Sequence, residues 1–379
     1  MTEPAESIPL SRLTTLQVGA APARMVEART RDELVAALRE VWADGDDWFV
    51  LGGGSNLLAG DEPFDGTVVR ILTTGFAEVP GAPEGRVRVR VGAGQNWDEL
   101  VAWSVSQGLR GIEAMSGIPG TAGAAPIQNV GAYGQEIVQT LVEVELIDEA
   151  TGEVHVVPAA ELGLGPRTSD LKRHYGEEPA RSAVILSLTL ELERVGTDPR
   201  PVTDARIASA IGLPPGAEAS LASIRDTVLR IRAAKGMVLD AADDDTRSAG
   251  SFFNNPIVTE QEARSLPADC PRWPMEPDID AVSVIPLERF DGWVPAPAPR
   301  QAPVKVSAAW LIEHSGLRKG FRLGRSRASL STKHTLAITN RGGATAGEIA
   351  ELARFVQMRV AQEFGIELRP EPVFVGVEL

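Results

Sequence analysis

The first part of the chain carries a helical pattern followed by two extended ones. A capping-box pair, Thr30 with Glu33, precedes apolar residues at helical spacing that run to Val41. The apolar runs at 47–51 (DWFVL) and 67–72 (TVVRIL) have the length and composition of buried strands. We expect an α/β unit in which a glycine-rich segment directly follows its first long strand.

The middle of the chain is dominated by extended patterns. Arg and Val alternate through 86–92 (RVRVRVG), which predicts a strand with one buried face, and the Pro/Gly-rich stretch before it predicts a domain boundary. A helix is expected from a cap at Asn96 to an end at Gly108. Three further strands are expected at 141–147, 153–158 and 183–192.

The last part contains two long connections and two helices. Residues 195–218 are polar and rich in turn formers, and a helix centred on Val228 follows them. Residues 265–304 form a second, proline-rich connection, and connections of that length are usually functional or mobile. A capped helix from Thr345 to Gly365, followed by a strand, ends the pattern.

Length and composition narrow the class of protein. A chain of 379 residues with 43% hydrophobic and 23% charged residues predicts two or three globular domains. No apolar run is long enough to span a bilayer, and the first residues have no basic segment before an apolar one, so neither a membrane span nor a secretory signal is expected. We expect a cytoplasmic protein.

Charge and cysteine content exclude other classes. The net charge of -15 disfavours general attraction to nucleic acid or to anionic membranes, so an anionic ligand requires local binding groups. A single cysteine, Cys270, excludes an internal disulfide, and the four histidines are scattered without metal-ligand spacing. We therefore expect no metal site.

The segment after the first long strand is a candidate phosphate cradle. It places Gly52, Gly53 and Gly54 before two small polar residues, Ser55 and Asn56. Exposed backbone N–H groups of such a loop can converge on phosphate oxygens. The segment matches neither the dinucleotide G-x-G-x-x-G pattern nor a Walker loop. Taken alone, the segment is more typical of a tight structural turn.

A longer glycine-rich segment spans residues 111–136. It contains six glycines among small and polar side chains and only a few apolar ones. Such a backbone can approach a flat, extended ligand closely from a preformed concave surface. The alternative is a glycine-rich surface loop, although such loops are normally shorter and more polar.

These segments resemble the UDP-N-acetylenolpyruvoylglucosamine reductase (MurB) family of flavoenzymes along nearly the whole chain. The motifs occur in the family's order: LGGGSNLL, GIPGTAGAAPIQNVGAYG, GSFFNNP, AAWLIEHSGLRKG, KHTLAITN and LRPEPVFVG. The resemblance implies an α+β chain: a two-subdomain FAD-binding fold like that of vanillyl-alcohol oxidase, with a C-terminal α+β substrate-binding domain. The expected limits are 1–78 and 79–235 for the subdomains and 236–367 for the substrate domain, with 368–379 returning to the first subdomain.

The resemblance also implies the reaction. NADPH reduces a noncovalently bound FAD, since 111–136 contains no His or Cys that could tether it. The flavin then passes hydride to C3 of the enolpyruvyl group of UDP-N-acetylglucosamine enolpyruvate, and a proton reaches C2, giving UDP-N-acetylmuramate for peptidoglycan synthesis. We expect a monomer with no nucleic-acid or membrane partner. The alternatives are another FAD-dependent oxidoreductase of the same fold, or a catalytically silent flavin- or nucleotide-sugar-binding module.

Site residues are carried over from the family motifs. Arg167 matches the arginine at the substrate carboxylate, Glu371 the catalytic glutamate and Ser251 the proton donor. A serine hydroxyl is a weak acid and needs help, which Lys235 or Asn255 could supply. The resemblance also implies substrate contacts for Lys235, Asn255 and Arg232. The residues expected to contact FAD are Gly52, Gly53, Gly54, Ser55, Asn56, Gly117, Ile118, Pro119, Gly120, Thr121, Gly123, Ala124, Gln128, Asn129, Gly131, Ala132 and Tyr133.

The chain departs from the family pattern in the connection before the substrate domain. Many members have a tyrosine near the stretch 200–206 that closes over the substrate diphosphate, whereas this chain has tyrosines only at 133 and 175. The acidic run 243–245 would repel a diphosphate, so we expect it to face solvent. The basic run 318–327 is expected to be a solvated loop. Phe252 and Phe253 are expected to anchor the segment that carries the serine.

Overall fold

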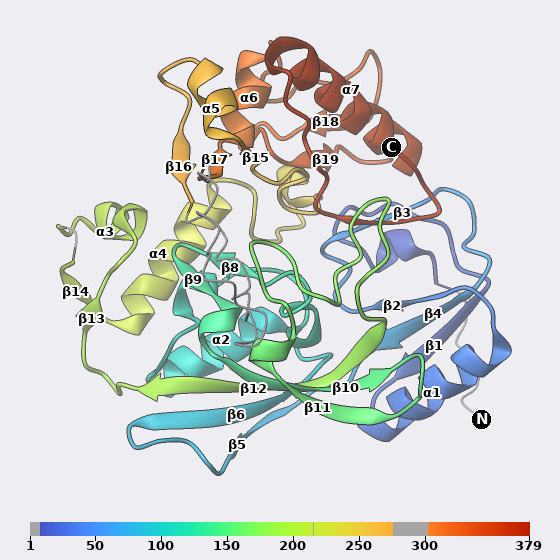
Figure 1. Cartoon of the computed structure of the whole chain (residues 1–379), viewed down its shortest axis with the longest axis vertical. Coiled ribbons are helices and arrows are strands. Elements are labelled where there is room, and N and C mark those ends of the chain that lie inside the picture. Colours follow the sequence, from blue (N-terminus) through green and yellow to red (C-terminus); the bar gives the residue numbers. More distant parts are fainter. Residues whose placement is uncertain (1–7, 215, 276–301) are drawn as a thin grey trace, which may run out of the picture.

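The computed structural model describes residues 8–214, 216–275 and 302–379. Figure 1 shows three parts: a small unit of parallel strands beside the N-terminus, a large antiparallel sheet along the base, and a helix-rich C-terminal unit above both. The connection between the sheet and the C-terminal unit forms a lobe at one side. This arrangement confirms the expected α+β class.

The N-terminal unit is built on three parallel strands in the order β1-β4-β2. The capping box expected at Thr30 is present: its side chain accepts a hydrogen bond from the main-chain N–H of Glu33, and the helix ends at Gly45 in the left-handed conformation. The elements of this unit are β1 (Arg24–Ala28), α1 (Arg31–Asp44), β2 (Trp48–Leu51), β3 (Leu57–Ala59) and β4 (Thr67–Ile71).

The second unit is an antiparallel sheet in the order β11-β10-β12-β6-β5, with β7 also paired to β12. The expected strands of this region are all present, and the helix capped by Asn96 ends at Ser106, close to the expected Gly108. Its elements are β5 (Phe76–Val79), β6 (Arg86–Gly92), α2 (Trp97–Ser106), β7 (Leu109–Arg110), β8 (Gly131–Ala132), β9 (Gln135–Glu136), β10 (Leu141–Asp148), β11 (Val154–Pro158) and β12 (Ala183–Arg194).

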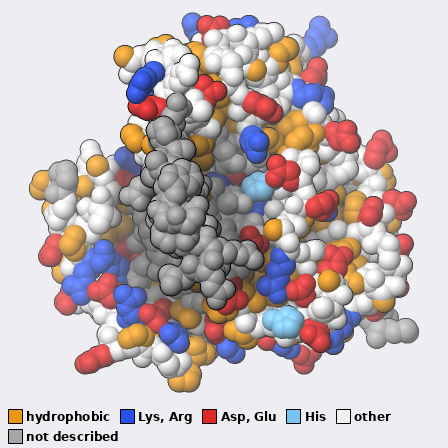
Figure 2. Space-filling view, in the orientation of Figure 1, with side chains coloured by type: hydrophobic (Ala, Val, Ile, Leu, Met, Phe, Trp, Pro, Cys, Tyr) orange, Lys and Arg blue, Asp and Glu red, His pale blue; other side chains and the backbone are white. Residues whose placement is uncertain are grey.

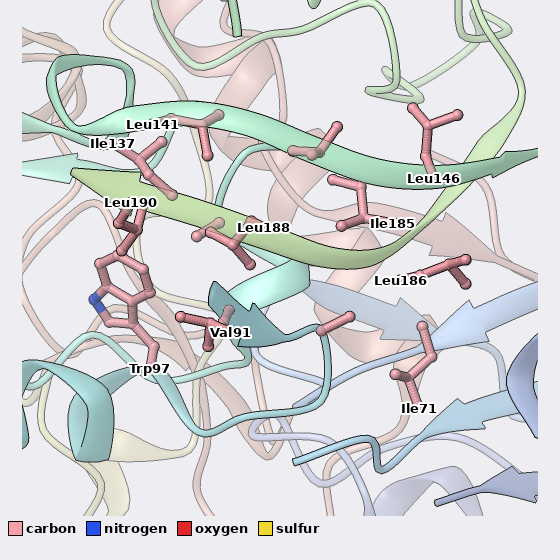
Figure 3. Packing of buried hydrophobic residues seen from close by; sticks show 14 of the residues in the cluster. Ile71, Val91, Trp97, Ile137, Leu141, Leu146, Ile185, Leu186, Leu188 and Leu190 are labelled. Carbon is pink, nitrogen blue, oxygen red and sulfur yellow. The ribbon is translucent and has the colours of Figure 1, made fainter. Parts of the chain in front are cut away.

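One hydrophobic core joins these two units. Figure 3 shows Trp97 of α2 beneath Leu188 and Leu190 of β12, while Ile71 of β4 lies near Leu186. Burial of such large apolar side chains stabilises the fold by about 1.5–3 kcal/mol each. Apolar side chains of the glycine-rich segment 111–136 belong to this core, so packing against the sheet holds the segment in place.

The connection 195–218 is more ordered than its composition predicts, and that prediction is wrong. It contains a short helix, α3 (Ala205–Ile211), between β13 (Arg200–Pro201) and β14 (Glu218–Ala219), followed by α4 (Leu221–Ala233). The carboxylate of Asp204 caps α3, and Ile207 packs with Val202 and Val228 in a small core. A helix of seven residues has too few apolar positions to show a clear period.

In the described part of the C-terminal unit, short strands pack against helices (Figure 1). The last of them, α7 (Ala346–Phe364), has the expected capping box at Thr345 and ends at Gly365. The final strand, β20 (Val373–Val375), pairs in parallel with β3 of the N-terminal unit. The other elements are β15 (Ile257–Val258), α5 (Glu260–Ser265), β16 (Arg272–Pro274), β17 (Val304–Val306), α6 (Ala308–His314), β18 (Ala328–Leu330) and β19 (Ile338–Asn340).

The prediction that the acidic run 243–245 faces solvent is wrong for Asp243 and Asp245, whereas the Asp244 side chain is 44% exposed. Asp245 is buried. Its carboxylate accepts hydrogen bonds from Thr332 and forms an ion pair with Arg341 at 2.6 Å. Asp243 pairs with Lys333 at 2.5 Å. These cations belong to the C-terminal unit. The ion pairs of the run therefore connect the segment before Ser251 to that unit.

Two further sequence expectations concern the surface and the long connection. Of the proline-rich connection 265–304, residues 276–301 lie outside the described part of the chain. Figure 2 shows acidic and basic side chains interspersed over one face, in keeping with an acidic but not uniformly charged surface. Within the described residues, no helix combines the length and apolar character that crossing a membrane requires.

Candidate functional site

The three parts of the molecule meet around one open pocket. All three residues expected to be catalytic, Arg167, Ser251 and Glu371, line it. The other lining residues come from both glycine-rich segments, α4 and the segment before the serine: Ser55, Asn56, Ile118, Pro119, Gln128, Val130, Gly131, Arg232, Gly236, Met237, Leu239, Thr246, Ser248, Ala249 and Gly250.

The two glycine-rich segments form one wall of the pocket by direct backbone packing. A Cβ atom on Gly53 would lie 2.7 Å from the Cα of Gly120, so only glycine allows this approach. The Ser55 hydroxyl donates to the carbonyl of Pro119 at 3.0 Å, which fixes the two segments against each other. Of the residues expected to contact FAD, Ser55, Asn56, Ile118, Pro119, Gln128 and Gly131 line the pocket, and Gly52, Gly54, Gly117, Thr121, Gly123, Ala124 and Ala132 belong to the supporting segments.

The backbone beside this wall is held in an uncommon conformation. Asn129, Tyr133 and Arg167 have positive φ angles of 41°, 50° and 59°, although none is glycine. Such residues carry strain that surrounding contacts must sustain, and they concentrate at functional sites. Asn129 supplies such contacts: its amide donates to Glu136 at 2.9 Å and to the carbonyl of Gly165 at 3.0 Å. The Asn129 side chain therefore supports the loop, and its expected contact with FAD stays a prediction.

Arg167 is held by main-chain carbonyls and not by a carboxylate. Its guanidinium donates to the carbonyl of Gly131 at 2.8 Å and to that of Asn129 at 3.5 Å. Within the described residues it has no salt-bridge partner. Because neutral carbonyl groups orient this guanidinium, no protein carboxylate offsets its positive charge, which can therefore bind an anion. Its planar pair of N–H groups suits a carboxylate.

Ser251 lies in the pocket on a rigid support. The neighbouring Phe252 and Phe253 are fully buried and stack edge to face with ring centroids 5.3 Å apart, as the sequence predicts for anchors. In the part of the chain that the structure describes, the Ser251 hydroxyl makes no hydrogen bond. An anchored backbone with a free hydroxyl is the arrangement that a ligand-facing serine requires.

Glu371 is fixed between the serine segment and the glycine loops. Its N–H donates to the carbonyl of Phe252 at 2.9 Å, and its carbonyl accepts from Lys172 at 2.9 Å. Burial raises the pKa of the Glu371 carboxyl group, and the charges of Arg167 and Lys172 oppose that rise. The carboxyl group makes no hydrogen bond to the described residues, so it is free to act on a ligand.

Lys172 is a member of this site that sequence reasoning missed. Its side chain is 3% exposed, and burial lowers its pKa to about 8, while the Glu371 carboxylate acts in the opposite direction. The residue lies in a polar segment five positions after Arg167, where nothing in the sequence distinguishes it from a surface lysine.

A group of cations lies beside α4 at the pocket. Arg232 is buried and lines the pocket, and its Nε has no hydrogen-bond partner in the described residues. Lys235 lies nearby and is half-buried; burial lowers its pKa, and the charges of Arg206 and Arg232 lower it further. Cations that face one another with few acids between them form a favourable place for a phosphate group.

The stretch that lacks the expected tyrosine contributes an arginine instead. The Arg206 guanidinium lies 4.9 Å from the ring centroid of Tyr133, and Asp204 pairs with it at 2.6 Å. Burial, together with the charges of Lys235 and Lys319, lowers the pKa of His334 to about 4. Lys319 is therefore the member of the basic run 318–327 that interacts with this cation group.

The remaining cations of the basic run are exposed, in keeping with the expected solvated loop. They are Arg318, Arg322, Arg325 and Arg327.

Asn255 lies outside the pocket. It is exposed, and its side-chain oxygen accepts a hydrogen bond from the N–H of Ala308 at 3.0 Å, at the start of α6. The structure gives this residue a capping role, whereas its neighbour Ser251 points to the ligand side. No group of three or more metal-ligating side chains occurs within the described ranges.

The residues present fit FAD on structural grounds. The glycine-rich wall offers backbone N–H groups to an extended ligand and its phosphates, and its two segments approach too closely for a side chain at Gly53. The arrangement therefore accommodates both a flat ring system and an anionic tail.

Comparisons with known proteins agree with this architecture. Residues 22–158 match the model of an FAD binding domain, which confirms the expected cofactor class, and residues 241–375 match that of the UDP-N-acetylenolpyruvoylglucosamine reductase C-terminal domain. The UDP-N-acetylenolpyruvoylglucosamine reductase of Leifsonia xyli is 51% identical over 100% of both chains, and that of Thermobifida fusca is 45% identical over 99% of both.

A solved structure gives the same result. The crystal structure of the Thermus caldophilus UDP-N-acetylenolpyruvylglucosamine reductase (MurB) matches with a TM-score of 0.60 at 25% identity and covers 98% of each chain. Family models over both halves, curated relatives over the full length and the shared fold lead to one conclusion: the chain belongs to the UDP-N-acetylenolpyruvoylglucosamine reductase family.

Proposed function

We propose that the protein reduces UDP-N-acetylenolpyruvoylglucosamine to UDP-N-acetylmuramate with NADPH, through bound FAD. The observation that carries the proposal is the meeting of Arg167, Ser251 and Glu371, from three distant segments, in one pocket beside the loops of the FAD binding domain. FAD, when bound, accepts a hydride from NADPH and supplies one to the substrate. NADPH is thereby oxidised, and the C2=C3 bond of the enolpyruvyl group is reduced.

Arg167 binds and stabilises the reacting acid group. Hydride addition at C3 leaves negative charge on C2 that is delocalised into the adjacent carboxylate. A preorganised donor near that charge lowers the barrier because it needs no rearrangement when the charge develops. The carbonyls of Asn129 and Gly131 hold the guanidinium in place without neutralising it, which is the preorganisation the step requires.

Ser251 supplies the proton to C2. Its hydroxyl is free within the described residues and faces the pocket from a backbone anchored by Phe252 and Phe253. A serine is a weak acid, so a second group must exchange protons with it or offset the charge that it acquires. Asn255 is committed to capping α6. We assign this supporting role to Glu371, whose raised pKa allows it to exchange protons closer to neutrality than an ordinary glutamate.

The binding groups divide between the two ligands. Ser55, Asn56 and Gln128 would hold FAD at the loop wall, and Arg232 with Lys235 would bind phosphate at the α4 side. Exclusion of water by the buried walls strengthens each of these interactions. We place the reaction in the cytoplasm, where nucleotide sugars and NADPH occur, and propose that the protein acts as a monomer.

A spectroscopic and kinetic assay tests the proposal. The purified protein should show the absorbance of an oxidised flavin, and NADPH oxidation should depend on added UDP-N-acetylenolpyruvoylglucosamine. Absence of flavin after reconstitution with FAD, or NADPH oxidation that is indifferent to this substrate, contradicts the proposal.

A further inference from the structure

Lys172 is a buried cation that has no role in the hydride and proton transfers proposed above. Its side chain is 3% exposed. Burial of an ammonium group costs several kcal/mol unless partners compensate, so lysines are seldom fully buried. Among the described residues no carboxylate lies within salt-bridge distance of it. The contacts that replace an ion pair indicate what the residue does.

The Lys172 ammonium joins three segments of the site. It donates to the main-chain carbonyl of Glu371 at 2.9 Å and reaches the side-chain oxygen of Gln128 at 3.5 Å. The Asn56 amide donates to the same two acceptors, at 3.4 Å and 2.5 Å. The C-terminal segment, the second glycine-rich segment and the first one are therefore connected through this one side chain and its neighbour.

These contacts fix the main chain on both sides of the Glu371 carboxyl group. The N–H of Glu371 is bound by Phe252, next to Ser251, and its carbonyl is bound by Lys172. Both polar groups of this peptide are thus used, and the side chain is the only part of Glu371 left without a partner among the described residues. The direction of the Glu371 side chain is therefore set by the hydrogen bonds of its main chain and not by contacts of its carboxylate.

The charges around the pair are few. Glu371 faces Arg167 and Lys172, and Lys172 faces Glu371 and, on its own segment, His174. The Glu371 carboxylate raises the pKa of Lys172 against the larger effect of burial, and Lys172 lowers that of Glu371 in the same way. Each group therefore stabilises the charged form of the other.

We propose that Lys172 is a positioning residue for Glu371: it holds the main chain that carries the carboxyl group and supplies a buried positive charge that favours the carboxylate. The proposal rests on the function above, in which Glu371 exchanges protons beside Ser251. Loss of Lys172 then changes where Glu371 titrates, in addition to how firmly it is held.

Two substitutions separate the charge from the anchor. Lys172→Met removes both, whereas Lys172→Gln removes the charge and keeps an N–H donor for the Glu371 carbonyl. Lys305→Met is the matched control, because Lys305 lies on β17 over the ring of Trp273 at 6.0 Å and has no contact with the site. Folding and FAD content are compared first by circular dichroism and flavin absorbance.

The first measurement requires no turnover. The chain has lysines only at 172, 235, 305, 319 and 333, so NMR of protein labelled at the lysine side chains resolves each one, and Lys172→Met assigns its signal. We expect Lys172 to titrate near pH 8 and, in Glu371→Gln, lower by about one pH unit. Titration near 10.5, or titration unchanged in Glu371→Gln, overturns the proposal.

The second measurement is the pH dependence of flavin reoxidation by substrate in a single turnover. Both Lys172 variants should move the acidic limb of this profile upward by about half a unit or more, because Glu371 loses a stabilising charge. Lys172→Met should also lose about tenfold in the maximal rate, and Lys172→Gln less, because only the former loses the donor. Equal slowing of flavin reduction and reoxidation with an unchanged profile, in flavin-loaded variants, would show a merely structural lysine and overturn the proposal.

The NMR and turnover measurements distinguish failure of this inference from failure of the proposed function. If the wild-type protein fails to reoxidise its flavin with substrate, the function is wrong, and the NMR arm still decides whether Lys172 and Glu371 are coupled. If both Lys172 variants fail to fold, variants of the four other lysines assign the Lys172 signal by elimination, and Glu371→Gln then decides whether the two groups are coupled.

Discussion

The N–H of Glu371 donates to the carbonyl of Phe252 at 2.9 Å, which joins the last strand segment of the chain to the residue beside Ser251. This hydrogen bond belongs to an antiparallel bridge between Phe253 and Pro370. It brings the proposed proton donor and the proposed acid-base partner into one rigid unit, which contacts the first glycine-rich segment where the Asn56 amide donates to the Glu371 carbonyl at 3.4 Å. The proposed proton transfer to C2 depends on that unit.

Replacement of Ser251 by Ala should separate the two half-reactions. NADPH-driven flavin reduction should stay nearly unchanged, whereas reoxidation by substrate should slow by about 10²- to 10⁴-fold, because only the second step needs a proton at C2. Stopped-flow absorbance under anaerobic conditions measures both. The control is Ser265→Ala, since Ser265 is exposed at the end of α5, outside the pocket, and its hydroxyl donates to the carbonyl of Glu262 at 2.6 Å. Equal slowing of both half-reactions in Ser251→Ala would argue against a proton donor.

Two substitutions of Arg167 should separate activity from backbone strain. Arg167→Ala and Arg167→Gly should both slow reoxidation by about 10²- to 10³-fold, because both lose the donor to the developing charge. Since φ at this position is 59°, glycine fits and alanine does not, so the Gly variant should be more stable than the Ala variant by about 1 kcal/mol. Chemical unfolding measures this difference. An Ala variant as stable as the Gly variant would contradict the assigned strain.

The close approach of Gly53 to Gly120 predicts a steric effect on FAD binding. Gly53→Ala places a methyl group 2.7 Å from a backbone atom, so the two segments must separate, and FAD affinity should fall by about tenfold or more. Titration of the flavin-free protein with FAD measures this. Gly347→Ala is the control, because the nearest atoms lie 3.6 Å away, outside the flavin wall, and its affinity should not change.

Burial of Lys172 should appear in the pH dependence of stability. Its pKa is about 8 in the folded protein and ordinarily 10.5, so the folded state binds fewer protons between these values. The unfolding free energy of the wild type should therefore rise across this window relative to Lys172→Met, by on the order of 3 kcal/mol in total. Below pH 8 the full cost of the buried charge is present. Unfolding midpoints at pH 7, 8, 9 and about 10 test the sign, and parallel curves for the two proteins would contradict it.

Local sequence signals predicted the regular elements well. The capping boxes at Thr30 and Thr345 and the alternation in 86–92 depend on residues within one turn or one strand, and the structure confirms the elements they predict. The C-terminal strand that follows α7 is likewise present. The α3 helix was missed because its stability comes from packing against α4 and not from a period of its own.

The candidate site was predicted from motif resemblance, and its supporting contacts were not. Lys172 and Glu371 are 199 residues apart, and Asp245 is 96 residues from Arg341, so neither burial could be deduced from local composition. The contact of Asn255 was not predicted either: the fold uses its side-chain oxygen to accept from the first N–H of α6, whereas its expected ligand contact stays a prediction. Long-range packing decides such cases, and the roles of the site residues stay predictions until variants are measured.

The most direct test of the central claim is one anaerobic turnover. The flavin is first reduced with one equivalent of NADPH, and UDP-N-acetylenolpyruvoylglucosamine is then added. The account predicts that the absorbance of oxidised flavin returns and that one equivalent of UDP-N-acetylmuramate, heavier than the substrate by two hydrogen atoms, forms. A flavin that stays reduced, or that reoxidises without this product, would contradict it.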